Sequence, residues 1–316
     1  LPSGFYNSFL QDQKGSDENH KVKKMKPLVS ILIPVYNAEK YLEETMDSVI
    51  SQDYEELEII ILDDGSSDSS FSIISSYALR DHRIKVERQE NRGIGECRNR
   101  LLSLGRGEFV FFLDSDDILS SSSLISKLVE DTEKYEADVA SALTLSFGKK
   151  TRKTWRKGIR LFSGSSFASL MTRPMGVFCY PHSRLIRKSL FSSLSFPVDM
   201  IFEDIPVMPW VIRKAGRVVY DRDVVYHYRI NKNGLSHGSF SSSSLYEMDA
   251  YYMNIMKGRE ERDGRITLYS SVFFLTKYYY YSMKVHSIGV TIKEYREKYG
   301  IYAKEAWKEL LSGGFR

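Results

Sequence analysis

Uninterrupted apolar runs alternate with amphipathic stretches along the first half of the chain. The run Phe109–Leu113, rich in aromatic side chains, is typical of a strand buried on both faces. Similar runs predict strands at Val29–Val35, Leu57–Leu62, Ile84–Glu87 and Asp138–Phe147. Helices are predicted at Glu39–Ile50, after Asp68, up to Gly105 and over residues 122–135. Repeated strand–helix units favour an α/β fold with a mostly parallel sheet flanked by helices.

After Phe147 the pattern becomes irregular. It predicts a basic loop at Lys149–Arg160, short helices at Ser163–Leu170 and Arg187–Leu194, a helix from Glu203-Asp204 to Arg213, and strands at Val218–Tyr220 and Val224–Tyr228. From Leu245 the pattern is helical, and Tyr269–Met283 is apolar all round, so the main domain, a partner subunit or a membrane must cover it. We therefore expect a flexible tail at 1–26, an α/β domain at 27–235 and a helical C-terminal region at 236–316.

Three carboxylates, Asp114, Asp116 and Asp117, crowd the end of the Phe109–Leu113 run. Carboxylates so close together repel one another and lose hydration energy, so we expect a positive group there. A divalent cation shared with a phosphate-bearing ligand would meet that need. In an extended segment, Asp114 and Asp116 would point to the same side. The alternative is an acidic turn that caps a helix beginning near Ser120.

Polar residues also follow the other predicted strands. Pro34 should break the ladder at the end of the first strand, and Tyr36-Asn37 comes next. Asp63-Asp64-Gly65 follows the second strand, and Asn91-Arg92-Gly93 follows the third. Ligands of parallel α/β sheets bind beyond the carboxyl ends of the strands, so we expect these clusters to form one site.

The composition narrows the class of protein. The chain has 316 residues and a net charge of +4, which is too mild to indicate nucleic-acid binding. Its two cysteines exclude a disulfide framework and no Cys/His cluster has zinc spacing, so we expect a reducing, cytoplasmic setting. No apolar run reaches the roughly 18 residues of a membrane span. The Lys-containing tail is expected to be a solvated linker, with contact to an anionic membrane surface as the alternative.

Together these blocks resemble the family-two glycosyltransferases of the GT-A fold. The likeness runs in order over roughly residues 28–235 and includes Ser30–Asn37, Leu62–Asp68, Asn91-Arg92-Gly93 with Arg98-Asn99, Gly107–Phe109, the DxD element Asp114–Asp117, Glu203-Asp204 and Tyr226–Arg229. Each block alone is weak evidence for the family, but five or more blocks in the same order are a specific signature of it. The N-terminal tail and the C-terminal helices lie outside the likeness.

The resemblance implies a nucleotide-sugar donor, most often a UDP-sugar. It assigns donor binding to Pro34, Tyr36, Asn37, Asp64, Asn91, Arg98, Asp114, Ser115 and Arg229. Among these, Pro34, Tyr36 and Asp64 match positions that cradle uracil. Asp114 matches the carboxylate on the ribose side. Arg229 and the loop after it would close over the phosphates and exclude water.

The resemblance also implies a divalent cation, Mn²⁺ or Mg²⁺, with Asp116 as a direct ligand and His227 as a further one. A half-buried His packed without a metal is the alternative for His227. The cation would offset the charge that builds on the diphosphate oxygens as the anomeric bond breaks.

On the acceptor side, Asp204 matches the general base proposed for the family, and Glu203 would support it or bind the acceptor. An acidic first helical turn stabilised by the helix dipole is the alternative. A single displacement inverts the anomeric centre, so an α-linked UDP-hexose would give a β-linked product.

The expected function is metal-dependent, inverting transfer of a hexose or N-acetylhexosamine from a UDP-sugar to a glycan hydroxyl in bacterial surface polysaccharide or glycoconjugate synthesis. The acceptor would be a glycan or lipid-linked glycan, in the cytoplasm or at the inner face of the plasma membrane. The C-terminal helices offer a place for peripheral membrane association or an oligomer contact. The rivals are a catalytically silent carbohydrate-binding GT-A module and a haloacid-dehalogenase-type phosphohydrolase. The latter places its motif after the first strand of its domain, whereas Asp114–Asp117 follows the fourth predicted strand.

Overall fold

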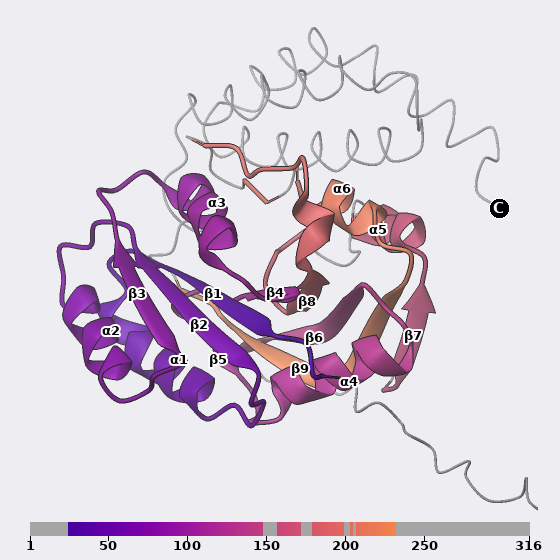
Figure 1. Cartoon of the computed structure of the whole chain (residues 1–316), viewed down its shortest axis with the longest axis horizontal. Coiled ribbons are helices and arrows are strands. Elements are labelled where there is room, and N and C mark those ends of the chain that lie inside the picture. The colour runs from indigo at the N-terminus through magenta and orange to yellow at the C-terminus, as the bar shows by residue number, and fades with distance from the viewer. Residues whose placement is uncertain (1–24, 148–156, 172–178, 199–202, 205–206, 232–316) are drawn as a thin grey trace, which may run out of the picture.

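The computed structural model describes residues 25–147, 157–171, 179–198, 203–204 and 207–231 (Figure 1). The strands are β1 (Val29–Val35), β2 (Leu57–Asp63), β3 (Ile84–Arg88), β4 (Phe109–Phe112), β5 (Ile118–Leu119), β6 (Val139–Phe147), β7 (Ile159–Phe162), β8 (Arg184–Arg187) and β9 (Val218–Arg229). The helices are α1 (Glu39–Ile50), α2 (Ser70–Ala78), α3 (Ile94–Leu104), α4 (Leu124–Lys134), α5 (Gly164–Met171), the 3₁₀-helix η1 (Lys188–Phe191) and α6 (Met208–Arg213). The elements of the first half closely match the predicted ones.

The described strands form one nine-stranded sheet in the order β3-β2-β1-β4-β8-β6-β9-β5, with β7 paired to β9. The strands β3, β2, β1 and β4 are parallel to one another, as are β6 and β9. By contrast, β8 runs antiparallel between β4 and β6, and β5 and β7 are antiparallel to β9. The predicted α/β class with a largely parallel sheet is confirmed.

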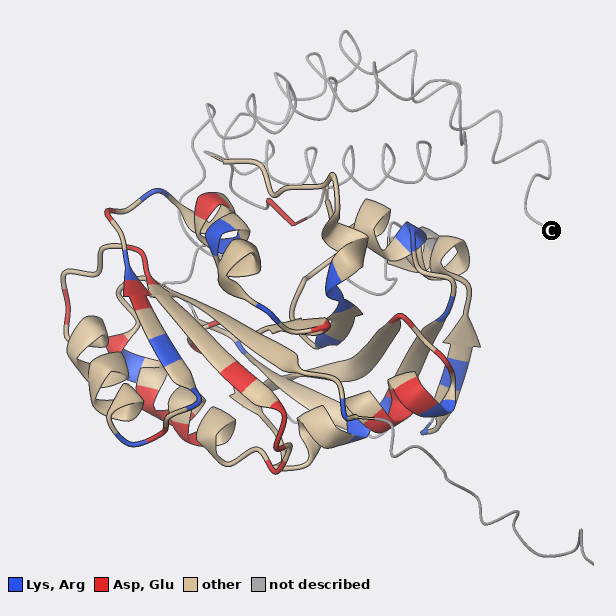
Figure 2. Ribbon diagram, viewed as in Figure 1, with Lys and Arg blue, Asp and Glu red and all other residues tan. Residues whose placement is uncertain are grey.

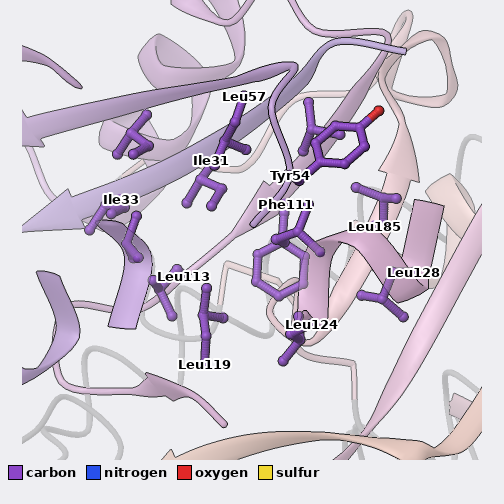
Figure 3. Packing of buried hydrophobic residues seen from close by; sticks show 14 of the residues in the cluster. Ile31, Ile33, Tyr54, Leu57, Phe111, Leu113, Leu119, Leu124, Leu128 and Leu185 are labelled. Atoms are coloured by element: carbon purple, nitrogen blue, oxygen red, sulfur yellow. The ribbon is translucent and has the colours of Figure 1, made fainter. Parts of the chain in front are cut away.

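Two apolar cores lie on opposite faces of the sheet because side chains alternate along each strand. Phe109 and Phe111 of β4 join the core under α1, α2 and α4, whereas Val110 and Phe112 join the core under α3, α5 and α6. Figure 1 shows these two sets of helices on opposite sides of the sheet, and Figure 3 shows Phe111 within the first core. Each such burial contributes roughly 1.5–3 kcal/mol. Burial on both faces explains the unbroken apolar runs in the sequence.

The strand order reverses at β1, because β2 and β3 lie on one side of it and β4 on the other. On the β2 side the ladder continues past Pro34 to Val35, whose carbonyl accepts a 2.8 Å hydrogen bond from Asp64 N. On the β4 side Leu113 N donates to Leu32 O at 3.1 Å, and the next residue facing β4 is Pro34, which has no N–H. The predicted break in the ladder therefore falls on one side only. It falls at the strand-order reversal, where ligands of such sheets bind.

Several predictions for the second half need correction. Only residues 188–191 of the expected helix Arg187–Leu194 are helical, because Arg187 ends β8. The two short strands expected around Asp221–Asp223 are one strand, β9, with a bulge in its pairing with β6. The helix expected to begin at Glu203 begins at Met208.

Other predictions concern residues outside the described ranges. These are the tail up to residue 24, most of the basic loop, and the helical region with its boundary at residue 235. Within the described ranges, no helix has the length and apolar character needed to cross a membrane. Charged residues lie mainly on the outer helices and loops, while β1 and β4 carry none (Figure 2).

Candidate active site

The loops after β1 and β2 are tied together at the carboxyl edge of the sheet. Asn37 Oδ1 accepts a 2.9 Å hydrogen bond from Ser67 N, and Asn37 N donates a 2.9 Å bond to Ser66 Oγ. Asn37 has a φ of 46°, a left-handed conformation that Asn adopts more readily than most residues. These contacts fix the backbone beside Tyr36, which is 51% exposed and accessible to a ligand.

Asp64, the predicted uracil-binding residue, holds the loop that follows β3. Its Oδ1 accepts a 2.9 Å hydrogen bond from Arg92 N, and its Oδ2 accepts one of 2.9 Å from Gly93 N. Gly65, with a φ of 78°, permits the close approach, because a Cβ there would lie 2.8 Å from Asn91 N. Asp64 therefore places the exposed Asn91 at the same edge of the sheet as the other strand-end clusters.

The segment after β4 is a turn, which corrects the expectation of an extended segment. Asp117 N donates a 3.1 Å hydrogen bond to Asp114 O, with Ser115 and Asp116 at the bend. Thr45 of α1 holds this turn, since its Oγ1 donates to Ser115 O at 3.0 Å and to Asp117 O at 2.9 Å. The turn brings carboxylate oxygens of Asp114 and Asp117 within 4.8 Å of each other.

Asp117, which the sequence analysis gave no individual role, is completely buried. Its Oδ2 accepts a 2.6 Å hydrogen bond from the Tyr226 hydroxyl, and its Oδ1 accepts one of 2.8 Å from Arg229 N. Burial, and then the carboxylates of Asp114 and Asp116, raise the pKa of Asp117 well above its usual value. Asp117 therefore fastens the end of β9 to the turn after β4.

Arg98 of α3 joins two carboxylates that are far apart in the sequence. Its Nε donates a 2.8 Å hydrogen bond to Glu203 Oε1, and its Nη2 donates one of 3.0 Å to Asp114 Oδ1. Burial opposes the charge, but the carboxylates of Asp114 and Glu203 outweigh it and raise the pKa of Arg98. Its buried Nη1 has no hydrogen-bond partner among the described residues. An unpartnered buried donor is costly and marks a place where a ligand group can bind.

Glu203 and Asp204 form a buried turn ahead of α6. The helix-capping alternative is not supported, because Val207 is the N-cap of α6 and no side-chain cap bond is formed there. Burial, and then the Glu203 carboxylate, raise the pKa of Asp204 to about 8. Burial also raises the pKa of Glu203, and Arg98 partly opposes that rise. The pair therefore retains a proton near neutral pH, and Asp204 is a stronger base than an exposed Asp.

Arg229, predicted to close over phosphates, is engaged by protein groups in this structure. Its Nε donates a 2.7 Å hydrogen bond to Asp116 O and its Nη2 one of 2.6 Å to Glu44 Oε2, while the guanidinium carbon lies 4.5 Å from the centre of the Tyr41 ring. Asp116 Oδ2 accepts a 3.0 Å bond from Asn231 Nδ2, and burial is the largest cause of its raised pKa. A phosphate contact by Arg229 would require it to exchange some of these partners.

His182, which the sequence analysis did not single out, lies beside the turn after β4. It is 1% exposed and pairs with Phe112 through an isolated β-bridge. Ligand atoms of Asp114, Asp117 and His182 all lie within 4.8 Å of one another, and no other such group of His, Cys, Asp and Glu occurs among the described residues. Burial lowers the pKa of His182 to about 3, so its ring is neutral. Two carboxylates and a neutral imidazole fit a divalent cation.

His227 occupies a different face of β9. Alternation along the strand places it opposite to Tyr226, whose hydroxyl binds Asp117. His227 pairs with Ile118 of β5, and burial lowers its pKa. The assignments of Asp116 and His227 as metal ligands stay predictions.

Most of the predicted residues gather at one edge of the sheet. Hydrogen bonds link Arg98, Asp114, Ser115, Asp116, Glu203 and Arg229 directly or through Asp117 and Thr45. The remaining donor-binding candidates Pro34, Tyr36, Asn37, Asp64 and Asn91 lie at or beyond the carboxyl ends of β1, β2 and β3, and Asp204 adjoins Glu203. Thr45, His182 and the anchoring roles of Asp117 and Tyr226 could not be predicted from local sequence patterns, because their partners are distant in the chain.

Comparison with known proteins places this arrangement in a family. The chain is 29% identical over 234 residues to glycosyltransferase GlyG of Streptococcus pneumoniae serotype 4, covering 69% of this chain and 76% of GlyG. It is 27% identical over 234 residues to the Campylobacter jejuni GalNAc(5)-diNAcBac-PP-undecaprenol beta-1,3-glucosyltransferase, covering 73% of this chain and 74% of that protein.

Solved structures share the fold. TarS 1-349 of S. aureus, in complex with UDP-GlcNAc, superposes with a TM-score of 0.61 at 20% identity, over 79% of this chain and 71% of that one. Mannosyltransferase PcManGT from Pyrobaculum calidifontis, in complex with GDP-Man and Mn²⁺, gives a TM-score of 0.57 at 16% identity, over 91% of this chain and 81% of that one. Residues 30–195 match the family described as Glycosyl transferase family 2. The chain therefore belongs to glycosyl transferase family 2 and has the GT-A fold, as its sequence motifs predicted.

Proposed function

We propose that the chain transfers a hexose or N-acetylhexosamine from a UDP-sugar to a hydroxyl of a glycan acceptor, with inversion and with the help of a divalent cation. The observation that carries the proposal is the Arg98 bridge. One guanidinium binds Asp114, in the turn after β4, at 3.0 Å and Glu203, next to Asp204, at 2.8 Å. The carboxylates assigned to the sugar donor and those assigned to the acceptor therefore lie on either side of the buried Arg98 guanidinium.

The donor half of the site is supported by the loops at the ends of β1, β2 and β3. Tyr36 offers an exposed ring, and Asp64 and Asn91 offer polar groups at the same edge, a combination suited to a nucleoside. TarS, which shares the fold, was crystallised with UDP-GlcNAc. We therefore propose UDP as the nucleotide, with the GDP-sugar bound by PcManGT as the comparison to test.

Breaking the anomeric bond leaves charge on a diphosphate. A bound divalent cation would supply Lewis-acid stabilisation of that charge, and Asp114 and its neighbours in the turn would hold it. The Nη1 group of Arg98 is buried and has no hydrogen-bond partner among the described residues, which suggests a further role for this residue. In the proposal, Nη1 donates a hydrogen bond to the UDP-sugar or to the acceptor as they bind.

The acceptor hydroxyl must lose a proton as it attacks. Asp204 is suited to accept it, because the raised pKa of about 8 makes its carboxylate a stronger base than usual. Attack from the side opposite the leaving diphosphate inverts the anomeric centre, so an α-linked UDP-hexose would give a β-linked product. The beta-1,3-glucosyltransferase activity named for the Campylobacter jejuni relative supports this outcome.

The acceptor is proposed to be a bacterial surface glycan or its lipid-linked precursor. The PP-undecaprenol acceptor named for the same relative supports this class. The haloacid-dehalogenase alternative is set aside because the chain belongs to glycosyl transferase family 2.

The proposal is tested by screening UDP- and GDP-sugars by thermal shift, with Mn²⁺ or with EDTA. A donor at 100 times its dissociation constant adds about 2.7 kcal/mol of apparent stability. Donors that stabilise the chain are then assayed for nucleotide release with and without oligosaccharide acceptors. We expect a UDP-sugar to bind and to release UDP in the presence of Mn²⁺. Binding with no release under any condition would instead favour the catalytically silent carbohydrate-binding module.

A further inference from the structure

Asn99 of α3 binds the backbone of a segment 97 residues further along the chain. Its Nδ2 donates a 2.8 Å hydrogen bond to Phe196 O, and Phe196 N donates a 2.8 Å bond to Asn99 Oδ1. A carboxamide carries both a donor and an acceptor, so it can pair with both polar groups of one residue's backbone. The two bonds therefore fix the position and the orientation of the Phe196 backbone relative to α3.

The first turn of α3 lies against the same segment and against the turn that carries the proposed base. Gly95 precedes Asn99 by one helical turn. A Cβ at residue 95 would overlap Pro197 O and would lie 3.6 Å from Glu203 Cβ. Gly95 therefore allows both chain segments to approach the helix closely. As a result, Pro197 and Glu203 share one contact surface on α3.

The ring of Phe196 is almost completely buried and packs on the residue that holds Glu203 in place. Its centre lies 6.0 Å from the guanidinium carbon of Arg98. Phe112, whose ring meets that of Phe196 edge to face at 5.7 Å, lies 5.5 Å from the same carbon. The two rings therefore shield the 2.8 Å hydrogen bond from Arg98 Nε to Glu203 Oε1. Such a bond is stronger in apolar surroundings than in water.

We propose that Asn99 is a positioning residue for the acceptor side of the site. By fixing the Phe196 backbone, it holds the ring that packs on Arg98. Arg98 in turn holds Glu203 and, with it, the adjoining Asp204. This inference rests on the proposed function and goes beyond it, because it gives Asn99 a role of its own. Within the described ranges, the hydrogen bonds of the Asn99 side chain go to Phe196 and not to the residues assigned to donor binding.

The expected consequence of losing the Asn99 carboxamide is slower turnover with unchanged donor binding. A general base must lie within hydrogen-bond reach of the proton that it accepts. Displacement of a reacting group by about 1 Å can lower the rate by roughly 100-fold. By contrast, the loops proposed to bind UDP are held by the hydrogen bonds of Asn37 and Asp64, which the loss of Asn99 leaves in place.

The experiment compares Asn99→Ala with the wild-type chain in two assays. Calorimetry measures the affinity for UDP in the presence of Mn²⁺. The rate of UDP release from the UDP-sugar selected by screening, with its acceptor present, gives kcat. We expect near-normal UDP affinity and a kcat that is lower by roughly 10- to 100-fold. Circular dichroism and urea unfolding check that each variant folds.

Ser30→Ala is the matched control, because it also removes two buried hydrogen bonds. Ser30 Oγ donates a 2.7 Å bond to Glu58 Oε1 and accepts one of 2.8 Å from Gly107 N, near the start of β1 and away from the site. This variant should be less stable than the wild type and have an unchanged kcat. Equal decreases of kcat in Asn99→Ala and Ser30→Ala would therefore contradict the inference.

Phe196→Leu keeps the test decisive if Asn99→Ala does not fold. It removes the ring and leaves the backbone bonds to Asn99 in place, so kcat should fall in the same way. A normal kcat in folded Asn99→Ala or in Phe196→Leu would overturn the inference. So would a loss of UDP affinity in Asn99→Ala, which would indicate a general structural role.

The proposed function is judged on the wild-type chain alone. A wild-type chain that transfers no sugar would refute the proposed function. Transfer by the wild type, with an undiminished kcat in Asn99→Ala, would refute only the positioning role.

Discussion

Arg98 Nε donates a 2.8 Å hydrogen bond to Glu203 Oε1, joining α3 to the turn before α6 across 105 residues of sequence. Both side chains are almost completely buried, so neither charge can be solvated if its partner is removed. Because the same guanidinium also binds Asp114, the contact fixes the base-bearing turn relative to the turn after β4. We expect the activity to depend on this geometry more than on the charge alone.

Replacement of Arg98 by Lys should therefore lower kcat/KM strongly. A Lys ammonium keeps the charge but cannot reproduce the planar, two-sided contact with Asp114 and Glu203. The loss of one charge-assisted hydrogen bond, worth about 1.5–3 kcal/mol, predicts a decrease of roughly 10- to 150-fold. Steady-state assays with the donor found by screening would measure it.

Arg100→Lys on the same helix is the matched control. Arg100 pairs with Glu87 at 3.1 Å, and both side chains are well exposed, so its effect on stability should stay below about 1 kcal/mol. Equal effects of the two substitutions on kcat/KM would contradict the role given to Arg98.

The pH dependence of kcat/KM should report the burial of Asp204. A base must be ionised to accept a proton, and the pKa of this carboxyl is raised to about 8. Activity should therefore rise with pH and level off above about 8, because kcat/KM reports ionisations of the free enzyme. A profile that is already flat from pH 5.5 upward would show that Asp204 is not the titrating base.

Substitution of Tyr226 by Phe should destabilise the chain by about 1–3 kcal/mol, since Asp117 Oδ2 would lose its 2.6 Å donor while remaining buried. Urea unfolding at pH 7 measures the change. Tyr220→Phe on the same strand is the control, because within the described ranges the Tyr220 hydroxyl makes no hydrogen bond to the turn Asp114–Asp117. If Tyr226→Phe were as stable as Tyr220→Phe, the anchoring role of Asp117 would be wrong.

A second buried carboxyl pair predicts a pH dependence of stability. Burial, and then Asp221, raise the pKa of Asp131 to about 7. Between its ordinary value and 7, the unfolded state binds fewer protons than the folded state, so stability falls as pH rises through this window. Asp131→Asn should remove that loss and be roughly 1–3 kcal/mol more stable than the wild type at pH 8, with a smaller difference at pH 5. Thermal unfolding of both proteins at the two pH values measures this difference in stability. A difference that is the same at pH 5 and pH 8 would show that Asp131 does not cause the pH dependence.

The elements that the sequence predicted well are those with a local signal. Val29–Val35 is apolar at nearly every position because both faces of β1 are covered, and Glu39–Ile50 carries the amphipathic period of a surface helix. By contrast, β8 is a four-residue strand, Arg184–Arg187, defined by its pairing with β4 and β6. No local pattern identifies such a strand.

The same distinction applies to the site. Asp114, Asp204 and Arg98 belong to motifs with recognisable spacing, and the structure brings Arg98 to Asp114 and to the neighbour of Asp204. His182 is a single His in an irregular segment, and only the pairing with Phe112 at the end of β4 places it near Asp114. The bend at Ser115-Asp116 also depends on a distant contact, from Thr45 in α1.

The most direct test of the account compares Asp204→Asn with the wild type in two assays on the same preparations. Calorimetry measures the affinity for the UDP-sugar with Mn²⁺, and product formation measures transfer to the acceptor. The account predicts near-normal donor affinity and a loss of transfer of at least ~100-fold, in line with the contribution of a general base. Retained transfer, or loss of donor binding together with transfer, would contradict the assignment of Asp204 as the base.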